Sequence, residues 1–153
     1  LQQLTDLAEE LDLQLLLENE KGLVGDIPER VLQLLAAVDS PRLRLIWDPA
    51  NFVQSKADKQ VDQWWDQLHP YIGYIHIKDA LADNGGVTPA GEGDGQVKEL
   101  LAQLKANGYT GILSLEPHLV VAGHSSGFSG AEGMETAVKA LRKLMSEVGI
   151  EER

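Results

Sequence analysis

Three acidic residues and one histidine stand at the ends of four short apolar segments of this 153-residue chain. Glu18, Asp48 and Glu116 come directly after apolar runs, and His76 lies near the end of another run. Their separations along the chain are 30, 28 and 40 positions, close to the roughly 30 residues of one strand-and-helix unit. Neighbouring units in a parallel sheet would bring the four side chains to one edge.

If these four side chains lie close together, they would favour binding of a divalent cation. Three carboxylates held together resist ionisation through mutual repulsion, and a cation between them removes that penalty. One imidazole with three oxygen donors suits Mn²⁺, Mg²⁺ or Zn²⁺, and the absence of cysteine excludes a thiolate site. The alternative is four unrelated caps or ion-pair partners, which is reasonable for one residue and much less so for four at matching positions.

The elements that must position these residues are visible as apolar patterns. Short apolar runs, typical of parallel strands covered by helices, lie at 13–17, 43–47, 71–77 and 111–115. Apolar residues at helical spacing predict five helices, in the windows 1–11, 31–38, 61–68, 97–104 and 134–148. The alternation of the two kinds of segment indicates an α/β fold with a parallel sheet.

The predicted helices carry start and stop signals. Asp26 with Glu29 fits the capping box at a helix start, and so does Ser129 with Glu132. Asn107-Gly108 fits a helix end. The connections from strand to helix are long and polar, whereas those from helix to strand are short. This asymmetry indicates a functional site at the carboxyl ends of the strands.

Five short motifs resemble the xylose isomerase-like TIM barrel superfamily of sugar phosphate isomerases and epimerases. In order along the chain they are Glu18-Asn19, Asp48-Pro49-Ala50-Asn51, His76-Ile77-Lys78-Asp79, Gly91-Glu92-Gly93 and Ser114-Leu115-Glu116-Pro117-His118. The superfamily also contains endonuclease IV, tagatose and psicose 3-epimerases, hydroxypyruvate isomerase and inosose dehydratase.

The resemblance implies the C-terminal half of a (β/α)₈ barrel, a fold that typically needs about 250 residues. Residues 1–153 would form one partial barrel domain, an opening helix followed by four strand-and-helix units, with four parallel strands and about five helices. The first half of the barrel would then be missing. We expect either that N-terminal half-barrel as a partner or a homodimer of half-barrels, because an open sheet edge is otherwise a liability.

In the family, the residues that match Glu18, Asp48, His76 and Glu116 bind one divalent metal, and the two glutamates move the proton. The resemblance therefore implies an isomerase or epimerase of a ketose or sugar phosphate. The metal would stabilise an enediolate, with Glu18 and Glu116 as catalytic acid and base. Two alternatives stay open, a lyase of the inosose dehydratase kind and a metal-binding half-barrel without turnover. Glu20 is a second candidate for the role of Glu18, because residues two apart in a strand point to the same face of the sheet.

Four further residues are candidates for substrate binding. Lys78 could bind a substrate oxygen, or it could pair with Asp79 or another carboxylate. Glu92 lies in a glycine-flanked loop that either approaches a ligand closely or is a simple tight turn. Asn51 and His118 complete the set. Asn51 stands where some relatives carry a second metal-site histidine, and without that histidine the three-zinc site of endonuclease IV cannot form.

The net charge of −11 would repel a phosphate backbone, so nucleic acid is not expected as a partner. No segment approaches the roughly 18 apolar residues of a membrane span, and no leader opens the chain, so we expect a cytoplasmic protein without a membrane partner. Segment 123–130 lies where barrels often bind phosphate, but it contains no Lys or Arg and Glu132 follows it. A free sugar or a small hydroxy-keto acid is therefore as good a candidate as a sugar phosphate.

Overall fold

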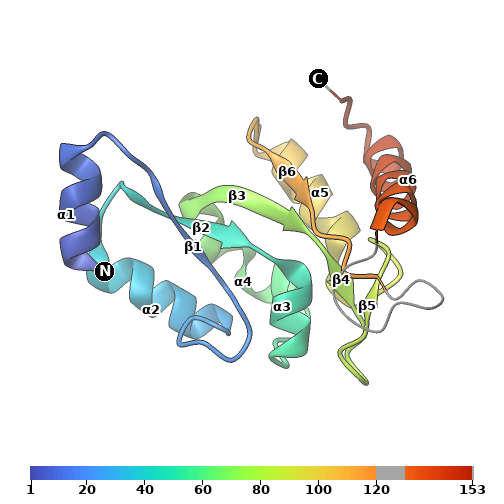
Figure 1. Ribbon diagram of the computed structural model, residues 1–153, viewed down its shortest axis with the longest axis horizontal. Coiled ribbons are helices and arrows are strands. Elements are labelled where there is room, and N and C mark those ends of the chain that lie inside the picture. The colour runs from blue at the N-terminus through green and yellow to red at the C-terminus, as the bar shows by residue number, and fades with distance from the viewer. Residues whose placement is uncertain (120–129, 153) are drawn as a thin grey trace.

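Four strands form one parallel sheet in the computed structural model, which describes residues 1–119 and 130–152 (Figure 1). Their order in the sheet is β1-β2-β3-β6. The strands are β1 (Leu15–Glu18), β2 (Leu43–Trp47), β3 (Ile72–Ile77) and β6 (Leu113–Leu115). All three pairings are parallel, which confirms the predicted α/β fold with four parallel strands.

Five helices accompany the sheet where the apolar spacing predicts them. They are α1 (Gln2–Glu10), α2 (Pro28–Val38), α4 (Gln60–Leu68), α5 (Val97–Ala106) and α6 (Gly130–Val148). A short 3₁₀ helix, η1 (His69–Tyr71), leads from α4 into β3. In Figure 1, α4 and α5 lie behind the sheet, and α6 packs beside α5. None of the helices in the described part of the chain combines the length and apolar character that crossing a membrane requires.

The apolar patterns do not predict one short helix and two short strands in the strand-to-helix connections. Helix α3 (Pro49–Gln54) begins directly after Asp48, and six residues are too few to show a helical stripe. Strands β4 (Asp79–Ala80) and β5 (Val87–Thr88) pair as an antiparallel hairpin within a segment expected to be a loop. Helix α3 packs against β4, so the helix and the hairpin lie together beyond the carboxyl ends of β2 and β3.

One face of the sheet packs on helices, and no helix of the described residues covers the other face. Along β2 the odd-numbered residues are buried in the core, whereas Arg44 and Ile46 between them are only partly buried. Because successive strand residues point to opposite faces, Asp48 continues the row of Arg44 and Ile46. Leu16 of β1 lies beside Arg44 in the register and is 42% exposed. The predicted site therefore belongs to the face that the helices leave open.

The predicted capping box at Asp26 and Glu29 is wrong. Helix α2 begins at Pro28 after Ile27, and no side chain among the described residues caps its first turn. Proline has no N–H to be capped, and it holds the preceding residue in an extended conformation. Asp26 instead accepts a hydrogen bond from Arg30 Nη1 at 2.6 Å.

The predicted end of the fourth helix is confirmed. Helix α5 has Asn107 as its C-cap, and Gly108 follows with a φ of 69°. The second predicted capping box rests on Ser129, which lies outside the described residues, as do residues 123–128 of the segment considered for phosphate binding.

Candidate metal centre

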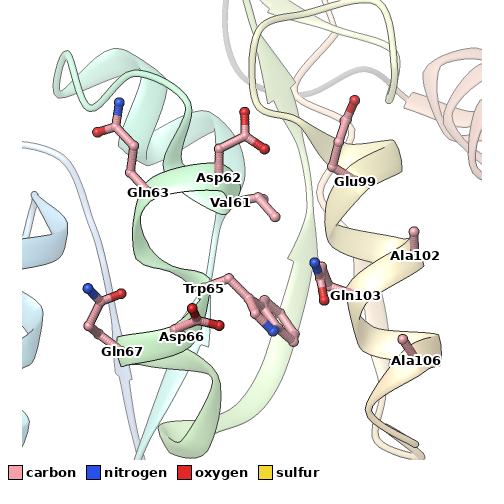
Figure 2. A pocket seen from close by; sticks show the side chains of 10 residues that line it. All are labelled: Val61, Asp62, Gln63, Trp65, Asp66, Gln67, Glu99, Ala102, Gln103 and Ala106. Carbon is pink, nitrogen blue, oxygen red and sulfur yellow. The ribbon is translucent and has the colours of Figure 1, made fainter.

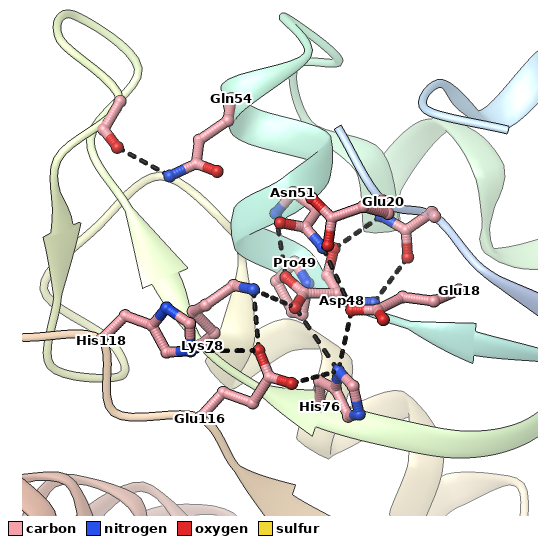
Figure 3. A network of polar contacts seen from close by, with 12 residues as sticks. Glu18, Glu20, Asp48, Pro49, Asn51, Gln54, His76, Lys78, Glu116 and His118 are labelled. Atoms are coloured by element: carbon pink, nitrogen blue, oxygen red, sulfur yellow. Dashed lines mark hydrogen bonds and ion pairs between the residues drawn. The ribbon is translucent and has the colours of Figure 1, made fainter. Parts of the chain in front are cut away.

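The four predicted metal-binding residues converge at the carboxyl ends of four neighbouring strands (Figure 3). Glu18, Asp48, His76 and Glu116 each offer one ligand atom, and these atoms all lie within 4.8 Å of one another. Glu18 closes β1, Asp48 follows β2, His76 lies in β3 and Glu116 follows β6. Parallel strands end at the same edge of a sheet, so residues far apart in the sequence meet in space.

His76 lies at the centre of the acidic cluster. Its Nδ1 is 3.0 Å from Glu18 Oε1, 3.1 Å from Glu116 Oε1 and 3.6 Å from Asp48 Oδ2. Burial by itself lowers the pKa of His76, but the carboxylates of Asp48, Glu18 and Glu116 outweigh burial and raise the pKa to about 10. The geometry therefore concentrates negative charge around one nitrogen atom.

Lys78 brings a second positively charged group into the same cluster, besides the imidazolium of His76. Its Nζ lies 2.7 Å from Asp48 Oδ2 and 2.9 Å from Glu116 Oε2, and only 6% of the side chain is exposed. Burial lowers the pKa of this amine, but pairing with the two carboxylates outweighs burial and raises the pKa above its ordinary value. The ion pair considered for Lys78 is thus present, and its partners are these carboxylates rather than Asp79.

The carboxylate of Asp48 is held so that one oxygen faces the cluster. Oδ1 accepts a hydrogen bond from Asn51 N at 2.9 Å, the N-cap interaction of α3. Oδ2 is buried and accepts no hydrogen bond of good geometry from the described residues, although Lys78 Nζ lies close to it. Burial raises the pKa of Asp48, but His76 and Lys78 outweigh burial and lower the pKa. An ionised, buried oxygen without a full set of partners suits a metal ligand.

Asn51 and Glu20 border the four residues. Asn51 is buried, and its Nδ2 donates to Glu18 Oε1 at 3.2 Å and to Glu20 Oε2 at 3.5 Å. Glu20 therefore lies beside the cluster, but it does not belong to the group of atoms that converge. Of the two glutamates considered for this place, Glu18 is the one at the shared centre.

The other two candidates for substrate binding differ in their relation to the centre. His118 is 50% exposed, and its Nε2 lies 3.9 Å from Glu116 Oε2. Glu92 is exposed on the turn 91–95, and within the described part of the chain no hydrogen bond or ion pair joins its side chain to the cluster. His118 thus borders the cluster, whereas Glu92 has no polar contact with it among the described residues.

The glycine-rich turn 91–95 wraps around a buried carboxylate. Asp79 accepts backbone hydrogen bonds from Gly91, Gly93 and Gly95 at 2.9, 3.1 and 2.8 Å. A Cβ added at Gly93 would lie 2.5 Å from Asp79 Oδ1, and one at Gly95 would lie 2.8 Å from it. The glycines thus permit a close approach to a side chain of the protein itself, and the turn supports the backbone next to Lys78.

Two buried amide side chains also support the site, and sequence reasoning gave neither a role. Asn19 pairs with both backbone groups of Asp48. Gln60 accepts from Trp47 Nε1 at 3.1 Å and donates to Pro49 O at 2.9 Å. Asn19 thus holds the backbone of Asp48 itself, and Gln60 links the side chain of Trp47 to the backbone of Pro49. Asn19 belongs to a motif noted in the sequence, but its partner is 29 positions away, and no local pattern points to that partner.

A groove of about 610 Å³ between α4 and α5 is separate from the cluster (Figure 2). Its walls include Trp65, Asp62, Asp66 and Glu99, and none of the cluster residues lines it. The groove lies between helices that cover the closed face of the sheet. The candidate site is therefore the polar cluster at the strand ends.

Residues 1–144 match the family model for the xylose isomerase-like TIM barrel. The chain belongs to this family. A relative, an uncharacterised protein of Methanocaldococcus jannaschii, is 29% identical over 76% of this chain and 41% of its own length. The chain thus spans less than half of that relative.

Solved structures of similar proteins share the arrangement of strands and helices. A xylose isomerase domain protein from Planctomyces limnophilus has a TM-score of 0.74 at 22% identity, over 97% of this chain and 52% of its own. The probable 3-DHS dehydratase of Bacillus anthracis has a TM-score of 0.70 at 23% identity, over 92% of this chain and 53% of its own. At these identities the likeness shows the fold. It confirms the predicted partial barrel, which spans about half of each neighbour.

Proposed function

We propose that this chain carries the metal-binding and proton-transferring residues of a divalent-metal-dependent isomerase or epimerase of a ketose or sugar phosphate. The observation that carries this proposal is the convergence of three carboxylates and one imidazole within 4.8 Å at neighbouring strand ends. Family membership supports it. Structural neighbours include a D-psicose 3-epimerase in the presence of D-fructose and an L-ribulose 3-epimerase.

The donor set fits a divalent cation such as Mn²⁺, Mg²⁺ or Zn²⁺. Glu18, Asp48 and Glu116 would supply oxygen ligands and His76 a nitrogen ligand. Asp48 Oδ2 is a buried acceptor that lacks a full set of partners. One structural neighbour, from Mycobacterium smegmatis, is in complex with magnesium, and another holds a zinc atom. A bound cation would supply Lewis-acid polarisation of a carbonyl and its adjacent hydroxyl.

Glu18 and Glu116 are suited to transfer a proton between substrate positions. They come from the first and last strands of the sheet, so their carboxylates approach the centre from two sides (Figure 3). One glutamate would remove the proton from the carbon beside the carbonyl, and the other would return it. Return to the opposite face of the same carbon gives an epimer, whereas return to the neighbouring carbon gives an isomer.

Asn51, Lys78, Glu92 and His118 are the proposed substrate-binding residues. Lys78 and Asn51 already contact cluster carboxylates, so a bound sugar hydroxyl would take over part of their hydrogen bonding. His118 borders Glu116 from the solvent side. Glu92 would reach a substrate only by extending inward from the turn 91–95.

Exchange of substrate protons with solvent deuterium tests this function. The Mn²⁺-loaded protein is incubated in D₂O with a panel of ketoses and ketose phosphates, and incorporation beside the carbonyl is followed by NMR. We expect incorporation together with an epimer or aldose product, and a loss of about 10²- to 10⁴-fold in E18Q and E116Q. E99Q, at an exposed position on α5, is the matched control. Equal rates in all four proteins would contradict the assignment of the two glutamates.

Lys78 favours a lyase as the second candidate. Elimination of water from a hydroxy ketone needs a base for the proton and an acid for the departing hydroxyl. The Lys78 ammonium lies among the cluster carboxylates, and one structural neighbour is a probable dehydratase. A dicarbonyl product without epimer formation would select the lyase. Stoichiometric metal binding without either product would identify a half-barrel that lacks turnover.

A further inference from the structure

Asn19 is buried beside two of the proposed metal ligands. It follows Glu18 directly in the chain and is 0% exposed. Its Oδ1 accepts a hydrogen bond from Asp48 N at 2.7 Å, and its Nδ2 donates to Asp48 O at 2.9 Å. One side chain therefore bridges the ends of β1 and β2. It forms hydrogen bonds with both the N–H and the C=O group of the Asp48 backbone.

The amide of Asn19 takes the place of a backbone partner. The register between β1 and β2 ends with Glu18 opposite Ile46, and Asp48 lies beyond it, fully buried. Buried N–H and C=O groups require hydrogen-bond partners. An asparagine side chain offers both a donor and an acceptor, so it can imitate a peptide group where the strand pairing has ended.

Fixing the backbone of Asp48 also fixes the direction of its carboxylate. Oδ1 is engaged by Asn51 N at the start of α3, and Oδ2 is left 3.6 Å from His76 Nδ1. Because Asn19 and Glu18 are adjacent in the chain, the same contact sets the spacing between the carboxylates of Glu18 and Asp48.

We propose that Asn19 is a positioning residue of the metal centre, which holds Glu18 and Asp48 at their spacing before a cation binds. The proposal rests on the proposed function for the identity of the two ligands. A ligand pair that is ordered in advance loses less freedom on binding. Loss of the Asn19 amide should therefore weaken cation binding beyond any effect on the stability of the fold.

Mn²⁺ titrations of matched variants test this role. The dissociation constant is measured by electron paramagnetic resonance for the wild-type chain and for N19A, N19S and L35A, together with the free energy of unfolding of each metal-free protein. Serine can pair with one of the two Asp48 groups, so N19S is the milder variant if N19A fails to fold. Leu35 is a buried core residue of α2, so L35A is a destabilised control whose ligands are intact.

We expect the dissociation constant to rise by about tenfold or more in N19A and by a smaller factor in N19S, and to stay unchanged in L35A. Wild-type constants in both Asn19 variants, or an equal rise in L35A, would overturn the proposal. Failure of the proposed function would look different, because Mn²⁺ binding would still depend on Asn19 while neither deuterium exchange nor elimination occurred.

Discussion

His76 is the residue at which a proton and a cation would compete. Burial lowers its pKa, but three carboxylates outweigh burial and raise the pKa to about 10 from an ordinary value of 6.5. A metal would bind the neutral imidazole, so binding must displace this proton. Cation binding to the cluster would therefore release this proton.

We expect the affinity for Mn²⁺ to rise with pH from about 6.5 to about 9, approaching tenfold per unit. The sign follows from the raised pKa of His76, because the imidazolium predominates in the metal-free protein throughout this range. Calorimetric titrations in buffers of different ionisation enthalpy would measure the release of about one proton per cation. A dissociation constant for Mn²⁺ that does not change with pH would show that the imidazole is neutral before the cation binds, which would contradict this prediction.

Replacement of Lys78 by methionine tests how the metal-free cluster is stabilised. The change removes an ammonium 2.7 Å from Asp48 Oδ2 and 2.9 Å from Glu116 Oε2. Loss of one partner from a buried pair costs about 3–5 kcal/mol, so we expect urea denaturation of metal-free K78M to show a loss of that order. Saturating Mn²⁺ should recover most of it. K98M, which removes an exposed pair with Glu147, should change little, and equal losses in both variants would contradict this interpretation.

At the scale of the elements, the conformation of the turn 91–95 depends on a few hydrogen bonds to one carboxylate. Its glycine N–H groups converge on the carboxylate of Asp79, and Gly95 packs against Pro49, which follows Asp48. The turn therefore supports the backbone near both Lys78 and Asp48.

G93A should destabilise the protein by about 1–3 kcal/mol in chemical denaturation, the usual effect of overpacking. The new methyl group would lie 2.5 Å from Asp79 Oδ1 and 2.6 Å from Ala80 O, and neither atom can move without breaking the turn. G86A is the control, because its methyl group would meet only the exposed side chain of Asn84. Asn84 can rotate away, since water can replace the exposed hydrogen bond that its Oδ1 accepts from Gly86 N. Equal stability of the two variants would contradict the description of the turn.

Elements with long apolar patterns could be predicted from the sequence, and elements defined by a few polar contacts could not. The five longer helices and four strands follow from apolar spacing, and with them the convergence of the strand-end residues. Helix α3 depends on one N-cap contact from Asp48. The roles of Asn19 and Asp79 depend on backbone partners that are distant along the chain. The capping pattern at Asp26 fails because Pro28 begins the helix and Ile27 is its N-cap.

At the scale of the whole molecule, the parallel sheet has an open face and two outer strands, and the structural neighbours are about twice as long as this chain. The chain spans 52% and 53% of two structural neighbours, and in the described part of the chain β1 and β6 are the outer strands of the sheet. Leu16 is 42% exposed and Ile112 is 60% exposed. Exposed apolar groups beside unpaired strand edges favour association.

We therefore expect the isolated chain to self-associate, with an apparent mass that rises with concentration in light scattering coupled to size-exclusion chromatography. L16E should shift the equilibrium toward the monomer, because a carboxylate on the open face opposes burial of that face. L23E, in the exposed segment between β1 and α2, should leave the equilibrium unchanged. A monomer at every concentration would show that the open face does not drive association.

Anomalous diffraction from crystals soaked in Mn²⁺ tests the central claim most directly. We expect one strong anomalous peak at coordination distance, about 2.0–2.6 Å, from ligand atoms of Glu18, Asp48, His76 and Glu116, with Lys78 Nζ displaced from Asp48 Oδ2. A saturated crystal with no peak between these four side chains, or with its peak at another place in the molecule, would contradict a shared metal centre.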